Sequence, residues 1–203
     1  MIAALPILAM AASAASPAAA PAPYPGTALL SAFRQACADL SSIDTAAANA
    51  RKAGWQDYVP DKDSQVAQLL DFGMGAAQEI SEDDPSFKTD LRTLRITLDG
   101  HDAELMLTGV TAMGTYSLGC RAVDFAAEKP LSDAEVSAFA RSFGKRAGKP
   151  GKIEAPGVMS AKVWKPGLFP GHTTTQIAFV PQDSQMKEAL HLSGINLMTQ
   201  LRN

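Results

Sequence analysis

The stretch "LRTLRITLDGHDAELMLTGV", residues 91–110, decides the fold. Leucine and isoleucine alternate with polar residues from 94 to 98, which is the period of a strand with one buried face. Asp99-Gly100 is typical of the two-residue turn that joins paired antiparallel strands. Apolar side chains then return over residues 103–107. The stretch therefore predicts a β-hairpin.

Further strands are predicted after the hairpin. The segment "TYSLGCRAVDF", residues 115–125, extends it into an antiparallel meander. Residues 157–164 and 173–180 are rich in apolar and β-branched side chains and predict two more strands. Residues 189–201 alternate as strands do, although a helix there remains an alternative.

Helices are predicted before and after the meander in the sequence. Amphipathic spacing indicates one beginning near Thr27 and another near Asp44, and both residues are expected to act as N-caps. A third follows over residues 63–80. A later helix is indicated by Ser132 and Glu135, which have the spacing of a capping box.

The expected fold class is α+β, with N-terminal helices packed on an antiparallel meander that carries one inserted helix. Residues 27–203 are expected to form a single domain. The chain has 203 residues, 46% hydrophobic and 19% charged, with a formal net charge of −3. Because the opposite charges nearly balance, nothing favours a nucleic acid as partner.

The N-terminus predicts export. Residues 1–14 form an apolar run with an A-x-A-like end, which is typical of a signal peptide and too short to span a bilayer. Residues 15–26 are an Ala/Pro linker. The run lacks a preceding Lys or Arg, and a plain Ala/Pro tail is the alternative. We expect a periplasmic or secreted protein whose mature chain has no membrane anchor.

Cys37 and Cys120 are the only cysteines. In an oxidising compartment an even number of cysteines usually pairs, which predicts a disulfide from the first helix to the third strand. Two buried free thiols are the alternative. No C-x-x-C motif indicates a redox site, and no spacing indicates a metal site.

Several short motifs resemble catalytic or binding signatures only in part. "GMGAAQ" at 73–78 lacks the third glycine of a dinucleotide fingerprint, and small residues at a helix contact are the better interpretation. "GKRAGKP" at 144–150 lacks the Ser or Thr of a phosphate loop. Ser142 and Ser117 lie outside the contexts that nucleophilic serines require. We predict no catalytic residue, no cofactor and no metal ligand.

The loop "WKPGLFPGHTTT" is the segment best suited to present a ligand surface. It combines Trp164, Phe169 and His172 with turn residues, and binding residues concentrate on loops. The alternative is that these aromatic side chains fold under their own loop. His101, among acidic residues at the hairpin turn, is interpreted as solvated.

The pattern F-R-Q-A-C … A-x-x-A-G-W, from Phe33 to Trp55, followed by Y-S-L-G-C-R-A-V-D-F, resembles small bacterial exported proteins of uncharacterised function. The resemblance implies a secreted domain with a disulfide and supplies no activity. Our hypothesis is a non-catalytic binding or accessory protein of the cell envelope, whose partner is an envelope protein or a small ligand. The alternative is a hydrolase acting on an envelope component.

Overall fold

The computed structural model describes residues 23–84 and 86–202, apart from the side chains of residues 76, 79, 80, 82, 83 and 146. The predicted signal peptide, residues 1–14, and most of the predicted linker lie outside the described residues. The described helices and strands, in chain order, are α1 (Gly26–Ala36), α2 (Ile43–Lys52), β1 (Gln56–Asp57), α3 (Gln65–Asp83), β2 (Lys88–Leu98), β3 (His101–Ala112), β4 (Thr115–Asp124), α4 (Asp133–Arg141), a 3₁₀ turn (Gly144–Arg146), β5 (Gly151–Ala155), β6 (Met159–Trp164), β7 (Thr174–Val180), α5 (Gln185–Leu190) and β8 (Gly194–Arg202).

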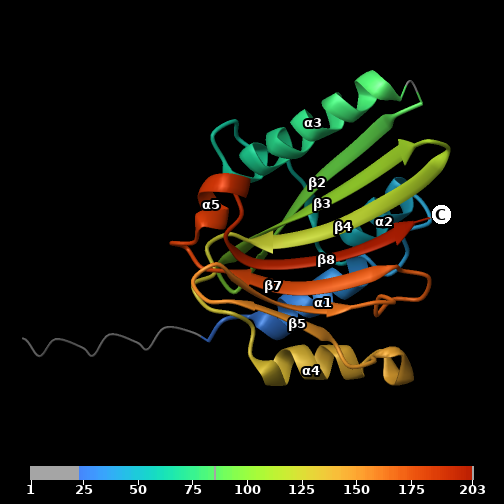
Figure 1. The fold of residues 1–203 in the computed structure, drawn as a ribbon. Helices are drawn as coiled ribbons and strands as arrows, with labels where there is room; N and C mark the ends of the chain where they lie inside the picture. Colours follow the sequence, from blue (N-terminus) through green and yellow to red (C-terminus); the bar gives the residue numbers. More distant parts are fainter. Residues whose placement is uncertain (1–22, 85, 203) are drawn as a thin grey trace, which may run out of the picture.

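The strands form one eight-stranded antiparallel sheet in the order β1-β2-β3-β4-β8-β7-β6-β5 (Figure 1). Strands β1–β4 make one meander and β5–β8 make a second. The two meanders meet where β4 pairs with β8, with Cys120 opposite Thr199. The predicted α+β class, with helices on an antiparallel sheet and one helix inserted between strands, is confirmed.

The β2–β3 hairpin has the predicted turn. Asp99 and Gly100 both have positive φ, 49° and 85°, as a type I′ turn requires. Leu98 pairs with His101 across the turn, and the register continues without a bulge to Lys88 and Thr111. The dipeptide thus fixes which residues of the two strands face each other.

The helix starts differ from two of the predictions. α1 begins at Gly26 after Pro25, with no side-chain cap, so Thr27 lies inside the first turn. At α2 the cap is Ser42, whose Oγ accepts the N–H of Thr45. Asp44 lies in the first turn of α2 instead, where its carboxylate suits the helix dipole. The predicted capping box of Ser132 and Glu135 at α4 is confirmed.

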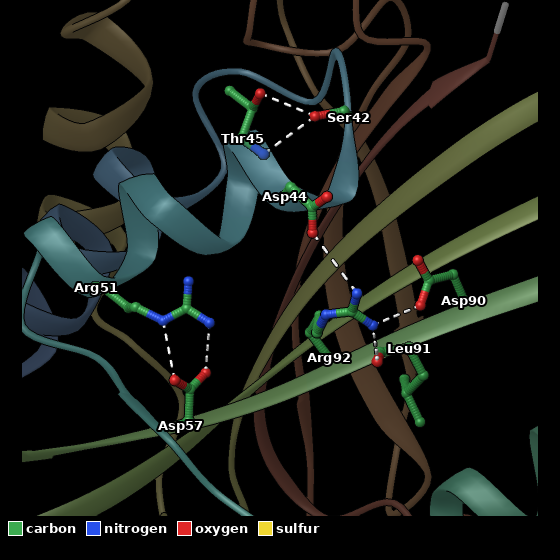
Figure 2. Close-up of polar contacts among 8 residues, drawn as sticks. All are labelled: Ser42, Asp44, Thr45, Arg51, Asp57, Asp90, Leu91 and Arg92. Carbon is green, nitrogen blue, oxygen red and sulfur yellow. Dashed lines mark hydrogen bonds and ion pairs between the residues drawn. The ribbon is translucent and has the colours of Figure 1, made fainter.

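Ion pairs attach α2 to the β1 edge of the sheet (Figure 2). Arg51 donates two hydrogen bonds to Asp57 on β1, at 2.9 and 2.8 Å. Arg92 on β2 lies between Asp44, at 3.6 Å, and Asp90, at 2.5 Å. Each of these guanidinium groups therefore has a carboxylate partner.

Helices α1, α2 and α4 cover one face of the sheet, and the larger hydrophobic core lies between them and the strands. Cys37, at the end of α1, forms a disulfide with Cys120 on β4, and both residues are fully buried. The predicted disulfide is confirmed. Trp55 is buried and donates from Nε1 to the carbonyl of Ala32, which closes α2 onto α1.

The end of the predicted linker belongs to the folded domain. The hydroxyl of Tyr24 donates to the Asp124 carboxylate at 2.8 Å, and Pro25 and Gly26 are buried. Tyr24, Pro25 and Gly26, which the sequence assigned to the linker, are therefore part of the folded domain. The C-terminal ambiguity is also resolved, because α5 ends at Leu190 and β8 begins at Gly194.

Candidate functional site

The face of the sheet opposite the large core carries helix α3. In Figure 1, α3 lies along the β2 side of the sheet, apart from α1, α2 and α4. Its first turns are buried, with Val66 1% and Leu69 8% exposed, and they pack with Met106, Val123 and Phe125 in a second, smaller core. Helix α3 is therefore attached to the sheet through its N-terminal part.

The middle of α3 leaves space above the sheet. Phe72 is 50% exposed and Met74 is 44% exposed. A Cβ built on Gly73 or Gly75 would meet no atom within 4 Å. The glycines of "GMGAAQ" thus lie inside a helix, where a dinucleotide loop is excluded, and they do not mark the tight helix contact that the sequence favoured.

Two adjoining cavities occupy this space, and together they are called the α3 groove below. The first has a volume of about 320 Å³ and the second about 490 Å³, both within the roughly 300–1,000 Å³ typical of small-molecule sites. Four residues line both cavities, namely Leu69, Gly73, Arg121 and Met198. Further apolar lining comes from Leu70, Met74, Val110, Ile153, Met159, Val180, Met186, Leu190 and Leu192.

Arg121 is the charged residue where the two cavities adjoin. It lies on the central strand β4, with Met106 of β3 opposite it on one side and Met198 of β8 on the other. Its Nη2 donates to the Met198 sulfur at 3.4 Å, which is a weak acceptor. Burial lowers the pKa of the guanidinium. Among the side chains that the structure describes, no carboxylate pairs with it.

A charged pair, Arg95 and Glu104, lies on the same face of the sheet as Arg121, and Glu104 is two residues along β3 from Met106, which pairs with Arg121. Glu104 is 9% exposed and accepts a hydrogen bond from Arg95 at 3.2 Å, while the Arg95 guanidinium stacks on the Tyr58 ring at 3.7 Å. Burial raises the pKa of Glu104 to about 7 despite the cation. This carboxyl group is thus already committed to Arg95.

On the other face of the sheet, Asp124 and His101 resemble an acid/base pair, but their contacts are structural. Asp124 is 1% exposed and accepts from Tyr24 and from the backbone amides of Ala126 and Ala127. His101 Nδ1 lies 3.7 Å from the same carboxylate. No described Ser, Thr or Cys side chain hydrogen-bonds to His101 or Asp124, so the described groups do not form a nucleophile and base pair.

The predicted ligand loop lies against the large core. Trp164, Phe169 and His172 are 3%, 2% and 3% exposed. Trp164 donates from Nε1 to the Gly148 carbonyl at 3.1 Å. His172 stacks on Phe169, and its Nδ1 is 2.8 Å from the Thr199 hydroxyl. Burial lowers the pKa of His172 to about 4.

The sequence analysis did not select Arg121, although a signal for it was present. A disulfide from the first helix to Cys120 requires Cys120 to face that helix, and successive side chains of a strand point to opposite faces. The next residue is therefore a charged side chain on the other face of a central strand. The α3 groove and the predicted loop lie on opposite faces of the sheet. The sequence analysis also did not predict that Met106 and Met198 are the cross-strand neighbours of Arg121.

Comparison of the chain with protein-family models, with curated proteins and with solved structures gave no significant match. Within residues 23–84 and 86–202, no cluster of three or more His, Cys, Asp or Glu is arranged to hold a metal ion. The described helices include none that is both long and apolar enough to cross a membrane.

Proposed function

We propose that the protein is an exported, non-catalytic binding protein whose α3 groove receives the apolar part of a small ligand. The observation that carries this proposal is the space beneath the middle of α3, where Gly73 and Met198 line both cavities. Methionine side chains are flexible and polarisable, and they suit surfaces that adapt to an apolar guest.

The disulfide and the N-terminal sequence support export. Disulfides such as Cys37–Cys120 form and persist mainly in oxidising compartments. The apolar leader-like run over residues 1–14 is the second support. A periplasmic or secreted location follows as part of the proposal.

Binding of a neutral apolar dye, followed by fluorescence, tests the proposal. N-phenyl-1-naphthylamine fluoresces strongly in apolar surroundings, and we expect saturable enhancement with the purified wild-type chain. Gly73→Leu places a side chain into both cavities and should abolish that enhancement.

Gly75→Leu is the matched control. It lies on the same helix, gains the same helix propensity, and lines neither of the two cavities. It should retain dye binding. Absence of saturable binding by the wild type, or equal binding by the Gly73→Leu variant, would refute the proposal.

A further inference from the structure

Arg121 differs from the two arginines of β2. Arg92 and Arg95 each have a carboxylate partner, at 2.5 and 3.2 Å. Lys162, which lines another cavity beside α4, is paired with Asp133. The Arg121 guanidinium has the Met198 sulfur as its described partner, and its position is the junction of two apolar cavities.

A partly buried cation without an anion is energetically costly, because desolvation is not compensated. None of the Arg121 nitrogens is both fully buried and unpaired, and Arg121 lines both cavities of the groove. Hydrogen bonds from a guanidinium to a carboxylate are charge-assisted and bidentate, and they are among the strongest in proteins. The groove therefore offers an anion-binding fork at the junction of two largely apolar cavities, the first of which also has Asp90 in its lining.

We propose that the ligand of the α3 groove is a single-chain amphiphile with a monocarboxylate head group, held by a bidentate ion pair with Arg121. The inference rests on the proposed function and specifies its ligand class. One guanidinium matches one carboxylate in charge and in its two-oxygen geometry, whereas a phosphate monoester carries nearly two charges. From the carboxylate at Arg121 the apolar chain extends into the second cavity, which Met159, Met186 and Met198 line and whose described lining includes no acidic residue.

Dodecanoate and dodecanol are the probes, measured by displacement of N-phenyl-1-naphthylamine from the full chain at pH 8. They share a chain length and differ in the head group. We expect wild-type protein to bind dodecanoate about 10–100-fold more tightly than dodecanol, which is the usual range for a hydrogen-bonded charge in a protein. Equal affinities would overturn the inference even if the dye binds well.

Arg121→Met removes the charge and keeps a long apolar side chain between Met106 and Met198. It should still bind the dye and dodecanol, and should lose the preference for dodecanoate. Arg121→Lys should recover part of the preference, because an ammonium group supplies the charge without the planar fork. Arg141→Met, at an exposed position of α4, is the control and should behave as wild type.

The outcomes separate the two proposals. Dye binding with no dodecanoate preference, or a preference that survives in Arg121→Met, refutes the carboxylate inference and leaves the groove function intact. No dye binding by wild-type protein refutes the groove function. A wild-type dimer that Gly73→Leu dissociates, with no dodecanoate binding, would show that a second chain fills the groove and refutes both. If Arg121→Met does not fold, the wild-type comparison of dodecanoate with dodecanol still decides.

Discussion

Removing the Cys37–Cys120 disulfide should cost a large part of the protein's stability. The bond joins the end of α1 to the middle of β4 across a sequence separation of 83 residues. Closing a loop of that length in the unfolded chain gives about 4.5 kcal/mol by the chain-entropy relation. Many domains have a total stability of about 5–15 kcal/mol.

The double variant Cys37→Ala/Cys120→Ala isolates this contribution. Both residues are fully buried, so the substitution also removes two packed sulfur atoms, and we expect a total loss of about 4–6 kcal/mol. Each single alanine variant should lose nearly as much, because either one breaks the same bond.

Guanidinium unfolding followed by tryptophan fluorescence is a suitable assay, since Trp55 and Trp164 are both buried in the large core. The oxidised wild type, the wild type with a reducing agent and the double variant are compared. The reducing agent should destabilise the wild type and leave the double variant unchanged. A double variant within about 1 kcal/mol of the oxidised protein would refute the loop-entropy reasoning.

Two further predictions concern Glu104 and Gly194. Because burial raises the pKa of Glu104 to about 7, the folded state keeps a proton that the unfolded state releases above its ordinary pKa of 4.5; unfolding free energy should fall by about 1–3 kcal/mol as pH rises from 4.5 to 7. Arg95, Asp102 and Asp124 act on this carboxyl group. The Glu104→Gln variant should lack the fall, so the fall should appear in the difference between wild type and variant in urea titrations, and equal pH profiles would contradict the assignment. Gly194→Ala should lower the unfolding free energy by more than about 2 kcal/mol, because φ is +73° and the new Cβ would overlap the Asp124 carbonyl. Gly100→Ala, at φ +85° with open space around it, is the control and should lower the unfolding free energy less. If thermal melts show the reverse order, the proposed overlap is refuted.

The features that the sequence predicted correctly have local signals. The Asp99-Gly100 turn needs two positive φ values, and the Ser132–Glu135 capping box needs only a spacing of three. The prediction that Asp44 caps the helix was wrong because Ser42, two residues earlier, supplies the capping hydroxyl, so α2 begins at Ile43. Local patterns identify the element and leave its first residue uncertain when two capping residues are close.

The candidate groove depends on non-local pairing, which a single sequence does not display. Arg121 lies beside Met198 only because β8 pairs with β4, and no pattern in either strand specifies that partner. β1 and β5 were missed for a related reason, because two residues and a largely exposed five-residue strand carry no alternating apolar signal. The loop from Trp164 to His172 was selected by composition, and its side chains meet the core.

The pairing of β4 with β8 also determines what a shortened chain would be. β8 is nine residues long and pairs with both β4 and β7, so the two meanders share it as their joint. It is synthesised after the other seven strands. A chain that stops before Gly194 would therefore keep every other strand of the sheet and lose its continuity, with the backbone groups of β4 and β7 exposed along two new edges. Such edges template association with other chains, so truncation at this end should yield aggregates rather than a smaller folded protein.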